Sequence, residues 1–169
     1  MLRRPTEDDA AFVLALLRDP ATTAHNPSDA LRTPAEARAL LQRWQGQWEA
    51  GPGYWIARLL HDDRAIGVCG AKAAEPEGRR VWNLLWRFAP EAWGHGYARE
   101  AAAEAVRCAI AADATRPVIA RVRPENRASA RLAAAIGLEW RPDLDLVGED
   151  GPDEVWATPG APIRSARTA

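Results

Sequence analysis

The chain has 169 residues, of which 47% are hydrophobic and 27% charged, and its net charge is −1. These values suit one globular domain with a sizeable core, and the near-neutral charge offers no basic field for nucleic acid. No run approaches the ~18 apolar residues of a membrane span, and Cys69 and Cys108 lack metal-ligand spacing, so we expect free thiols, no metal site and a cytoplasmic location.

Two helices are expected first along the chain. A Thr-x-x-Asp pattern at residue 6 has the form of a capping box and predicts a helix over about 7–18. A Thr-Pro-x-Glu pattern at residue 33 is a stronger start, with proline in the first helical position, and predicts a helix over about 34–50. Leu41, Trp44 and Trp48 would share one face of this second helix.

Strands dominate the middle of the chain. The strand expected over 81–88 is apolar on both faces except at Asn83 and Arg87, so we expect it at the centre of the sheet. The other expected elements are strands at 54–60, 65–72 and 117–123, a last strand pair around 138–147 and 153–157, and helices at 96–112 and 126–136. This order predicts a layered α/β or α+β domain over residues 1–157, followed by a disordered tail over 158–169.

The segment 93-WGHGYAREA-101 places a Gly-x-Gly turn before a helix. A helix start leaves N–H groups without partners, and glycine lets a ligand approach the backbone, so the arrangement suits a phosphate or pyrophosphate. The alternative is that Gly94 and Gly96 only make a tight turn. The third glycine of a dinucleotide fingerprint is absent, and no Gly-Lys-Ser/Thr follows, which excludes a Walker A loop.

A second motif follows after one strand. The segment 124-PENRASARLAAAIGLEW-140 contains an Asn-x-x-Ser helix that ends in Gly-Leu. Together the two segments resemble the signatures of the GNAT superfamily of N-acetyltransferases, and the opening residues 2–10 are similar to its branch of ribosomal-protein N-terminal Ser/Ala acetyltransferases. The resemblance implies a GNAT fold, with a mixed, mostly antiparallel sheet of about six to seven strands, about four flanking helices and splayed central strands.

The resemblance also implies acetyl-CoA as the co-substrate. The backbone N–H groups of the Gly-x-Gly turn would hold its pyrophosphate, and the end of the strand at 81–88 would pair with its pantetheine arm. The cofactor-binding residues implied in this way are Phe88, Ala89, Trp93, Gly94, His95, Gly96, Tyr97, Ala98, Arg99, Asn126 and Ser129.

Some of these residues have plain structural alternatives. Asn126 is also explained as the N-cap of the helix that follows it, and Arg99 as a solvated surface residue. We expect Trp93 to pack beneath the loop, and His95 to be exposed rather than catalytic.

The resemblance implies three catalytic candidates, Ser129, Asn83 and Phe88. The backbone N–H near Phe88 would donate to the developing oxyanion, and Ser129 would protonate the departing thiolate. The alternative for Ser129 is a small polar residue satisfied by its own helix. Many GNAT enzymes carry a glutamate base where this chain has Asn83, and a tyrosine acid where it has Ala133.

No strong base stands out in the sequence. Glu75, Glu77, Asp143 and Asp145 lie in expected loops or strand edges, where a solvated charge is the simpler interpretation, and Asn83 would instead order a relaying water. An α-amine has a pKa of about 7.7–8.0, against about 10.4 for lysine. A site without an evident base therefore favours a weakly basic amine.

The resemblance implies an acetyl-CoA-dependent N-acetyltransferase that moves the acetyl group to a primary amine by direct attack, and the absence of an evident base favours a protein N-terminal α-amine as acceptor. A small-molecule amine acetyltransferase of the detoxification type stays open; an acidic acceptor cleft would favour it, but no acidic cluster is obvious. A non-catalytic acyl-CoA-binding module also stays open, and an unrelated phosphate-binding domain is the most distant alternative. No nucleic-acid or membrane partner is expected, and the family implies a homodimer.

Overall fold

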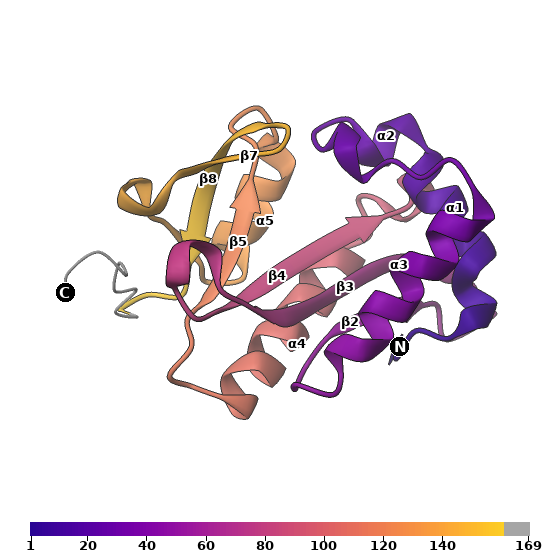
Figure 1. The fold of residues 1–169 in the computed structure, drawn as a ribbon, viewed down its shortest axis with the longest axis horizontal. Helices are drawn as coiled ribbons and strands as arrows, with labels where there is room; N and C mark the ends of the chain where they lie inside the picture. The colour runs from indigo at the N-terminus through magenta and orange to yellow at the C-terminus, as the bar shows by residue number, and fades with distance from the viewer. Residues whose placement is uncertain (161–169) are drawn as a thin grey trace.

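An eight-stranded sheet is the scaffold of residues 1–160, the part of the chain that the computed structural model describes (Figure 1). The strand order is β1-β2-β3-β4-β5-β8-β6, and β7 pairs with β8 beside this path. Neighbouring strands are antiparallel, except that β4 and β5 run parallel. The strands are β1 Leu2–Arg3, β2 Tyr54–Arg58, β3 Ala65–Ala74, β4 Val81–Phe88, β5 Val118–Val122, β6 Glu139–Trp140, β7 Leu146–Gly148 and β8 Gly151–Ala157.

Within the same residues, five α-helices cover the two faces of the sheet. Val13 and Leu41, on the first and third helices, share one core with Ile56 of β2. Ala102, on the fourth helix, shares the opposite core with Ala57. Because Ile56 and Ala57 are adjacent in β2, their side chains point to opposite faces of the sheet. The helices are α1 Ala10–Arg18, α2 Pro20–Thr23, α3 Pro34–Gln47, α4 Tyr97–Ala112 and α5 Arg127–Ala135.

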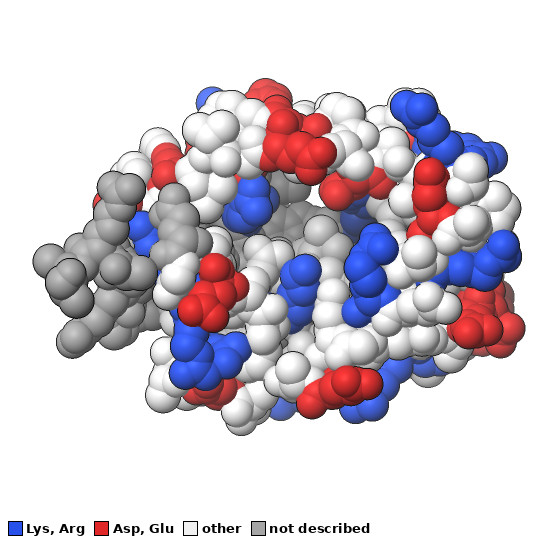
Figure 2. Space-filling model, in the orientation of Figure 1, with Lys and Arg blue, Asp and Glu red and all other residues white. Residues whose placement is uncertain are grey.

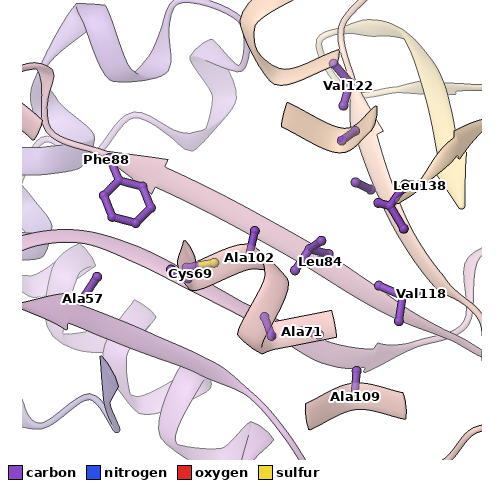
Figure 3. Close-up of a cluster of buried hydrophobic side chains, with 14 of the residues drawn as sticks. Ala57, Cys69, Ala71, Leu84, Phe88, Ala102, Ala109, Val118, Val122 and Leu138 are labelled. Carbon is purple, nitrogen blue, oxygen red and sulfur yellow. The ribbon is translucent and has the colours of Figure 1, made fainter. Parts of the chain in front are cut away.

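Helix α4 approaches the sheet closely because its buried positions are alanine. Figure 3 draws Ala102 and Ala109 in one cluster with the small side chains of Cys69 and Ala71 on β3. All four side chains are fully buried. A helix with such a stripe fits against a sheet without space for longer side chains, and this contact fixes the start of α4 beside the end of β4.

The two central strands diverge after a short contact. β4 and β5 pair only from Trp82 to Leu84 on β4, opposite Val118 to Ala120 on β5. β5 then continues along β8, and Figure 1 shows β4 and β5 separating toward the side of α2. The expected splay of the central strands is therefore confirmed, and so is the central place of β4.

The expected GNAT fold class is confirmed, with differences at the edges. Residues 1–160 hold eight strands and five α-helices, against the six to seven strands and four helices that we expected. The extra elements include β1, with two residues, and α2, with four, which are too short to show a period. The helix expected over 7–18 begins with a 3-10 turn, and Asp9 completes its capping box by accepting from the Thr6 N–H at 2.7 Å.

The end of the described chain is still tied to the sheet. Thr158, the first residue of the expected tail, donates its N–H to the Val118 carbonyl at 3.0 Å, and its hydroxyl accepts from the Val118 N–H at 3.2 Å. The rest of that prediction, over 161–169, lies outside the described residues. Among the helices of residues 1–160, none combines the length and apolar character needed to cross a bilayer.

Candidate active site

Two cavities adjoin where β4 and β5 diverge, and they share Leu84, Arg87 and Arg121 as wall residues. Figure 2 shows this face of the molecule hollowed at its centre, with basic and acidic side chains around the hollow. The polar cavity has a volume of about 480 Å³, and its wall includes Asp29, Tyr54, Lys72, Asn83, Asp150 and Asp153. The aromatic cavity has a volume of about 350 Å³, and its wall includes His25, Trp86, Phe88, Trp93, Asn126 and Ser129.

The start of α4 is open to a ligand. Gly94 and Gly96 have φ angles of +77° and +80°, a region that costs glycine nothing. A Cβ on either residue would meet nothing within 4 Å, so the space around the turn is free of protein. Glu100 is the first residue of the helix to donate its N–H to a helical carbonyl, that of Gly96 at 3.1 Å. The N–H groups before it have no helical acceptor and suit a pyrophosphate.

The backbone of β4 offers further N–H groups to the gap. Trp82 donates its N–H toward β5, to the Pro117 carbonyl at 2.8 Å, whereas Ala89 donates toward β3 on the other edge. Because the direction alternates along a strand, the N–H groups of Trp86 and Phe88 face the side of β5. The last pairing between β4 and β5 comes two residues before Trp86. Both N–H groups therefore point into the space between the diverging strands.

Ser129 reaches the aromatic cavity from the first turn of α5. Asn126 caps this helix, because its side-chain oxygen accepts from the Ser129 N–H at 3.0 Å. The Ser129 hydroxyl oxygen accepts a hydrogen bond of 3.1 Å from the indole Nε1 of Trp86 on β4. The serine is therefore held by a side chain of the sheet rather than by its own helix, and its proton is left to donate to a ligand.

Asn83 lies at the floor of the polar cavity, in contact with a buried phenol. Its Nδ2 donates to the Tyr54 hydroxyl oxygen at 3.3 Å. Burial raises the pKa of Tyr54 to about 12, so the phenol stays neutral and is no base at neutral pH. Lys72 lies across the β3–β4 ladder from Asn83, with its Nζ 5.8 Å from the centroid of the Tyr54 ring.

Ion pairs line the polar cavity. Arg87 of β4 pairs with Asp29 at 2.6 Å, and Arg121 of β5 and Arg123, the residue after β5, pair with Asp153 at 2.5 and 3.2 Å. No acidic cluster is obvious in the sequence, yet acidic side chains line this cavity. The fold gathers Asp29, Glu149, Asp150 and Asp153 from segments about 120 residues apart in the chain. Most of these carboxylates are matched by arginine, so the cavity is charged but nearly balanced.

Hydrogen bonds close the polar cavity on the side of α2. The Ser28 N–H and hydroxyl donate to the Asp150 carboxylate at 3.0 and 2.6 Å. Arg123 donates through Nε to the His25 carbonyl at 3.0 Å, and its side chain is only 3% exposed. Figure 1 shows the loop after α2 and the β7–β8 hairpin approaching each other above the gap. The loop after α2 and the C-terminal strands are thus joined over the cavity.

The other predicted cofactor-binding residues near the start of α4 are mostly exposed. Trp93 does not pack beneath the loop as we expected: its side chain is 51% exposed, because its Nε1 turns to donate to the Phe88 carbonyl at 2.7 Å. His95 is exposed and stacks on Tyr97, with 5.5 Å between ring centroids. Arg99 is exposed in the first turn of α4.

The acidic residues weighed as bases lie elsewhere. Asp143 pairs with Arg141 at 2.8 Å, and Asp145 accepts from the Val155 N–H at 2.8 Å. Neither they nor Glu75 line the two cavities, and the side chain of Glu77 lies outside the described part of the structure.

Neither cysteine is set up as a nucleophile. Burial raises the pKa of the Cys69 thiol well above its usual range, because the residue is enclosed between β3 and α4. The pKa of Cys108 is also raised, by partial burial and then by its contact with Glu104. A thiol is reactive mainly as the thiolate, so this site is suited to direct transfer between two bound substrates. The described residues hold no group of three His, Cys, Asp or Glu side chains that could bind a metal ion.

Comparison with known proteins gives a family match over most of the chain. Residues 1–139 match the family model of the acetyltransferase (GNAT) domain. The protein YkkB of Bacillus subtilis, whose own function is uncharacterised, is 31% identical over 99 residues, which are 57% of this chain and 58% of that relative. The matched segment therefore spans less than two thirds of this curated relative.

Solved structures share the fold across nearly the whole chain. An acetyltransferase from Agrobacterium tumefaciens has a TM-score of 0.75 at 23% identity and covers 92% of this chain and 88% of its own. The aminoglycoside acetyltransferase AAC(6')-Ib, solved in complex with coenzyme A, has a TM-score of 0.74 at 18% identity, with 94% and 93% covered. At these identities the likeness supports the fold, and residue roles depend on the geometry of this chain.

Proposed function

The chain belongs to the GNAT acetyltransferase family, and we propose that it moves the acetyl group of acetyl-CoA to a primary amine held in the polar cavity. The observation that carries this proposal is the junction of the two cavities at the point where β4 and β5 diverge. A thioester in the aromatic cavity and an amine in the polar cavity would meet there. Holding both reactants in line makes attack effectively unimolecular.

The residues of this chain fit acetyl-CoA as the co-substrate. The open N–H groups at the start of α4 suit its pyrophosphate, and the glycines there leave space for it. The N–H groups of Trp86 and Phe88 suit the pantetheine arm and the thioester carbonyl. Asn126 is fully explained as an N-cap by its bond to Ser129, and its remaining amide hydrogens are a further donor toward the same groove.

Two groups of this chain would act during transfer. The neutral amine attacks the carbonyl carbon and the new C–N bond forms. The extra proton on the nitrogen passes to water, and the C–S bond then breaks to release the thiolate. The Phe88 N–H would stabilise the oxyanion, and the Ser129 hydroxyl would donate its proton to the departing sulfur. The Trp86 indole holds Ser129 in the orientation that leaves this proton free.

The bridge over one side of the polar cavity favours a small acceptor over a folded protein surface. The Ser28–Asp150 and Arg123–His25 contacts join the loop after α2 to the C-terminal strands above the cavity. These contacts narrow the entrance that a folded protein terminus would have to use. The similar structure AAC(6')-Ib is described as an aminoglycoside acetyltransferase, which is also a small-amine acceptor class.

A protein N-terminal α-amine is the second candidate acceptor, and Asn83 favours it. An amide cannot take the proton of an ammonium group, so the acceptor amine must be largely neutral already or lose its proton to water. A peptide α-amine has a pKa of about 7.7–8.0, so neutralising it at pH 7 costs about 1.4 kcal/mol, against roughly 4.6 kcal/mol for a lysine side chain.

An amine panel tests the proposed function directly. Purified protein is mixed with acetyl-CoA and, in turn, with small primary amines, an unstructured peptide with a free N terminus, and a folded protein. We expect thiol release and an acetylated product, identified by mass spectrometry, with small amines and little with the folded protein. Acetyl-CoA binding without thiol release on any amine would make the chain a non-catalytic binding module instead.

A further inference from the structure

Position 72 is chemically singular in this chain. The sequence contains 22 lysine and arginine residues, and Lys72 is the single lysine among them. It lies on β3, half-buried in the wall of the polar cavity. An ammonium differs from a guanidinium in being a compact point charge with three donors on a flexible stem. Because arginine supplies every other basic side chain of this kind, the lysine in the cavity wall suggests a role that an arginine would not fill.

Lys72 contacts an aromatic face, and no described carboxylate forms an ion pair with it. Its Nζ lies 5.8 Å from the centroid of Tyr54, at the outer limit of a cation–π contact. The Tyr54 hydroxyl is occupied by Asn83. Among the described side chains, no Asp or Glu comes within ion-pair distance of Lys72.

The other cations of the cavity wall differ in this respect. Arg87 is paired with Asp29, and Arg121 and Arg123 are both paired with Asp153. Arg43 lies in the wall too, but its side chain is exposed to solvent. A half-buried cation has lost part of its hydration and gains from an anion that approaches it. Lys72 is the cation in this cavity whose charge the protein leaves for a ligand.

We propose that Lys72 binds a carboxylate of the acceptor, so that the substrates are amines that also carry a carboxylate. This inference rests on the proposed function, because it places the acceptor in the polar cavity. The apolar side chains of Leu16, Leu31 and Leu40 in the same wall would contact the segment between the two charged ends.

The position of Lys72 also sets the length of the acceptor. Lys72 is level with Asn83 on β4, five residues before Phe88, whose N–H would hold the thioester carbonyl. Five strand residues span about 17 Å, and an extended lysine side chain spans about 6 Å of that distance at most. The amine and the carboxylate must therefore be several bonds apart. A dipeptide or tripeptide with free ends satisfies this spacing, whereas a single α-amino acid does not.

A matched pair of substrates separates the carboxylate from the amine. Glycylglycine and glycylglycinamide have the same reacting α-amine, and only the first has a carboxylate. We expect kcat/KM for glycylglycine to exceed that for glycylglycinamide about tenfold or more, the value of a charge-assisted hydrogen bond. Glycine should be a poor acceptor because its carboxylate lies too close to the amine. Equal rates for the two dipeptides would overturn the inference.

Variants of Lys72 link that preference to the residue. Lys72→Met keeps an apolar stem without the charge, and we expect it to remove the preference for glycylglycine while the rate with glycylglycinamide stays within about threefold. Lys72→Arg should retain most of the preference because the charge remains. Arg107→Met is the matched control, because Arg107 pairs with Glu104 on the exposed side of α4, away from both cavities.

The outcomes distinguish this inference from the proposed function. If the wild type acetylates amines with and without a carboxylate equally and Lys72→Met behaves as wild type, the inference fails and the acetyltransferase proposal stands. If no amine is acetylated although acetyl-CoA binds, both fail together.

A binding measurement gives a readout besides activity. Reductive methylation with 13C-formaldehyde labels the one lysine and the N-terminal amine, and it preserves the positive charge of both. We expect N-acetylglycylglycine, which has the carboxylate but no reactive amine, to shift the Lys72 methyl resonance in the NMR spectrum, and the corresponding amide to leave it in place. An unshifted resonance with both ligands would leave the contact with Tyr54 as the whole role of Lys72.

Discussion

The indole Nε1 of Trp86 donates a hydrogen bond of 3.1 Å to the hydroxyl oxygen of Ser129. This bond joins β4 to α5 on the two sides of the gap where the central strands diverge. Because the serine oxygen receives this hydrogen, its own proton can be directed only toward another acceptor. Trp86 is thus a positioning residue for the proposed proton donor, and it is not itself a catalytic group.

Trp86→Phe should lower kcat without removing acetyl-CoA binding. Phenylalanine keeps a smaller aromatic ring in the wall of the aromatic cavity, and it cannot donate the hydrogen bond to Ser129. We expect kcat to fall about tenfold, which corresponds to one hydrogen bond of about 1.4 kcal/mol, while KM for acetyl-CoA changes little. Stopped or continuous thiol-release assays at saturating acceptor measure both constants.

The double variant checks that Trp86 acts through Ser129. Ser129→Ala alone should reduce kcat about 100-fold, as expected for loss of a general acid. In that background Trp86→Phe should have no further effect, because the partner of the indole is already gone. A full additional tenfold loss in the double variant would show that the indole serves another purpose.

The glycine loop and the serine were accessible from sequence because each belongs to a local motif. Gly94 and Gly96 precede a helix directly, and Asn126 and Ser129 lie within one helical turn, so spacing alone defines them. The Trp86–Ser129 bond could not be predicted, because it joins residues 43 positions apart across a gap that only the splayed strands create. Long-range pairs of this kind carry no local pattern.

Gly96→Ala should weaken acetyl-CoA binding by at least about tenfold. Gly96 has a φ of +80°, where a side chain costs about 1–3 kcal/mol, and a shift away from this conformation would turn the first N–H groups of α4. Calorimetric titration with acetyl-CoA measures the loss. A bulkier test is Gly96→Trp, whose ring would enter the open space where the pyrophosphate is expected.

Gly46→Ala is the matched control for the loop glycine. Gly46 lies inside α3, and an added Cβ would meet nothing within 4 Å. Alanine should stabilise this helix by about 0.5–1 kcal/mol and leave acetyl-CoA affinity unchanged. If Gly96→Ala bound acetyl-CoA as tightly as Gly46→Ala, the loop would be only a structural turn.

The polar cavity shows the limit of sequence reasoning most clearly. Tyr54, Lys72 and Asn83 come from three different strands, and they meet only because of the sheet register. Asp29 and Asp153 come from opposite ends of the chain and were invisible as a cluster. One feature of the sequence does point to this cavity, because Lys72 is the single lysine of the chain. The core of the sheet was easier to predict from the sequence, because strand periodicity and apolar runs are local properties.

Ala102→Leu should destabilise the fold by about 1–3 kcal/mol. Ala102 is 0% exposed where α4 meets the sheet, and three additional heavy atoms would force the helix outward (Figure 3). Ala103→Leu is the control, because Ala103 faces solvent on the same helix and should change stability by no more than about 0.5 kcal/mol. Urea unfolding with a common slope measures both. Equal stabilities would contradict the close packing of α4.

The Ser28–Asp150 contact above the polar cavity predicts that its contribution to stability depends on pH. The pKa of Asp150 is lowered, chiefly by the hydrogen bond from the Ser28 hydroxyl and also by the Ser28 N–H. A carboxyl group with a lowered folded-state pKa contributes stability above its unfolded pKa of about 3.9 and loses it as pH falls through the folded value. We expect Ser28→Ala to lower the melting temperature slightly at pH 7 and to have progressively less effect below pH about 4.

Asp150→Asn should show the same convergence, whereas the control Arg107→Met, at an exposed pair on α4, should leave the Ser28 effect unchanged. A Ser28→Ala effect that is constant from pH 7 down to about 3 would show that the hydrogen bond does not depend on the charge of Asp150.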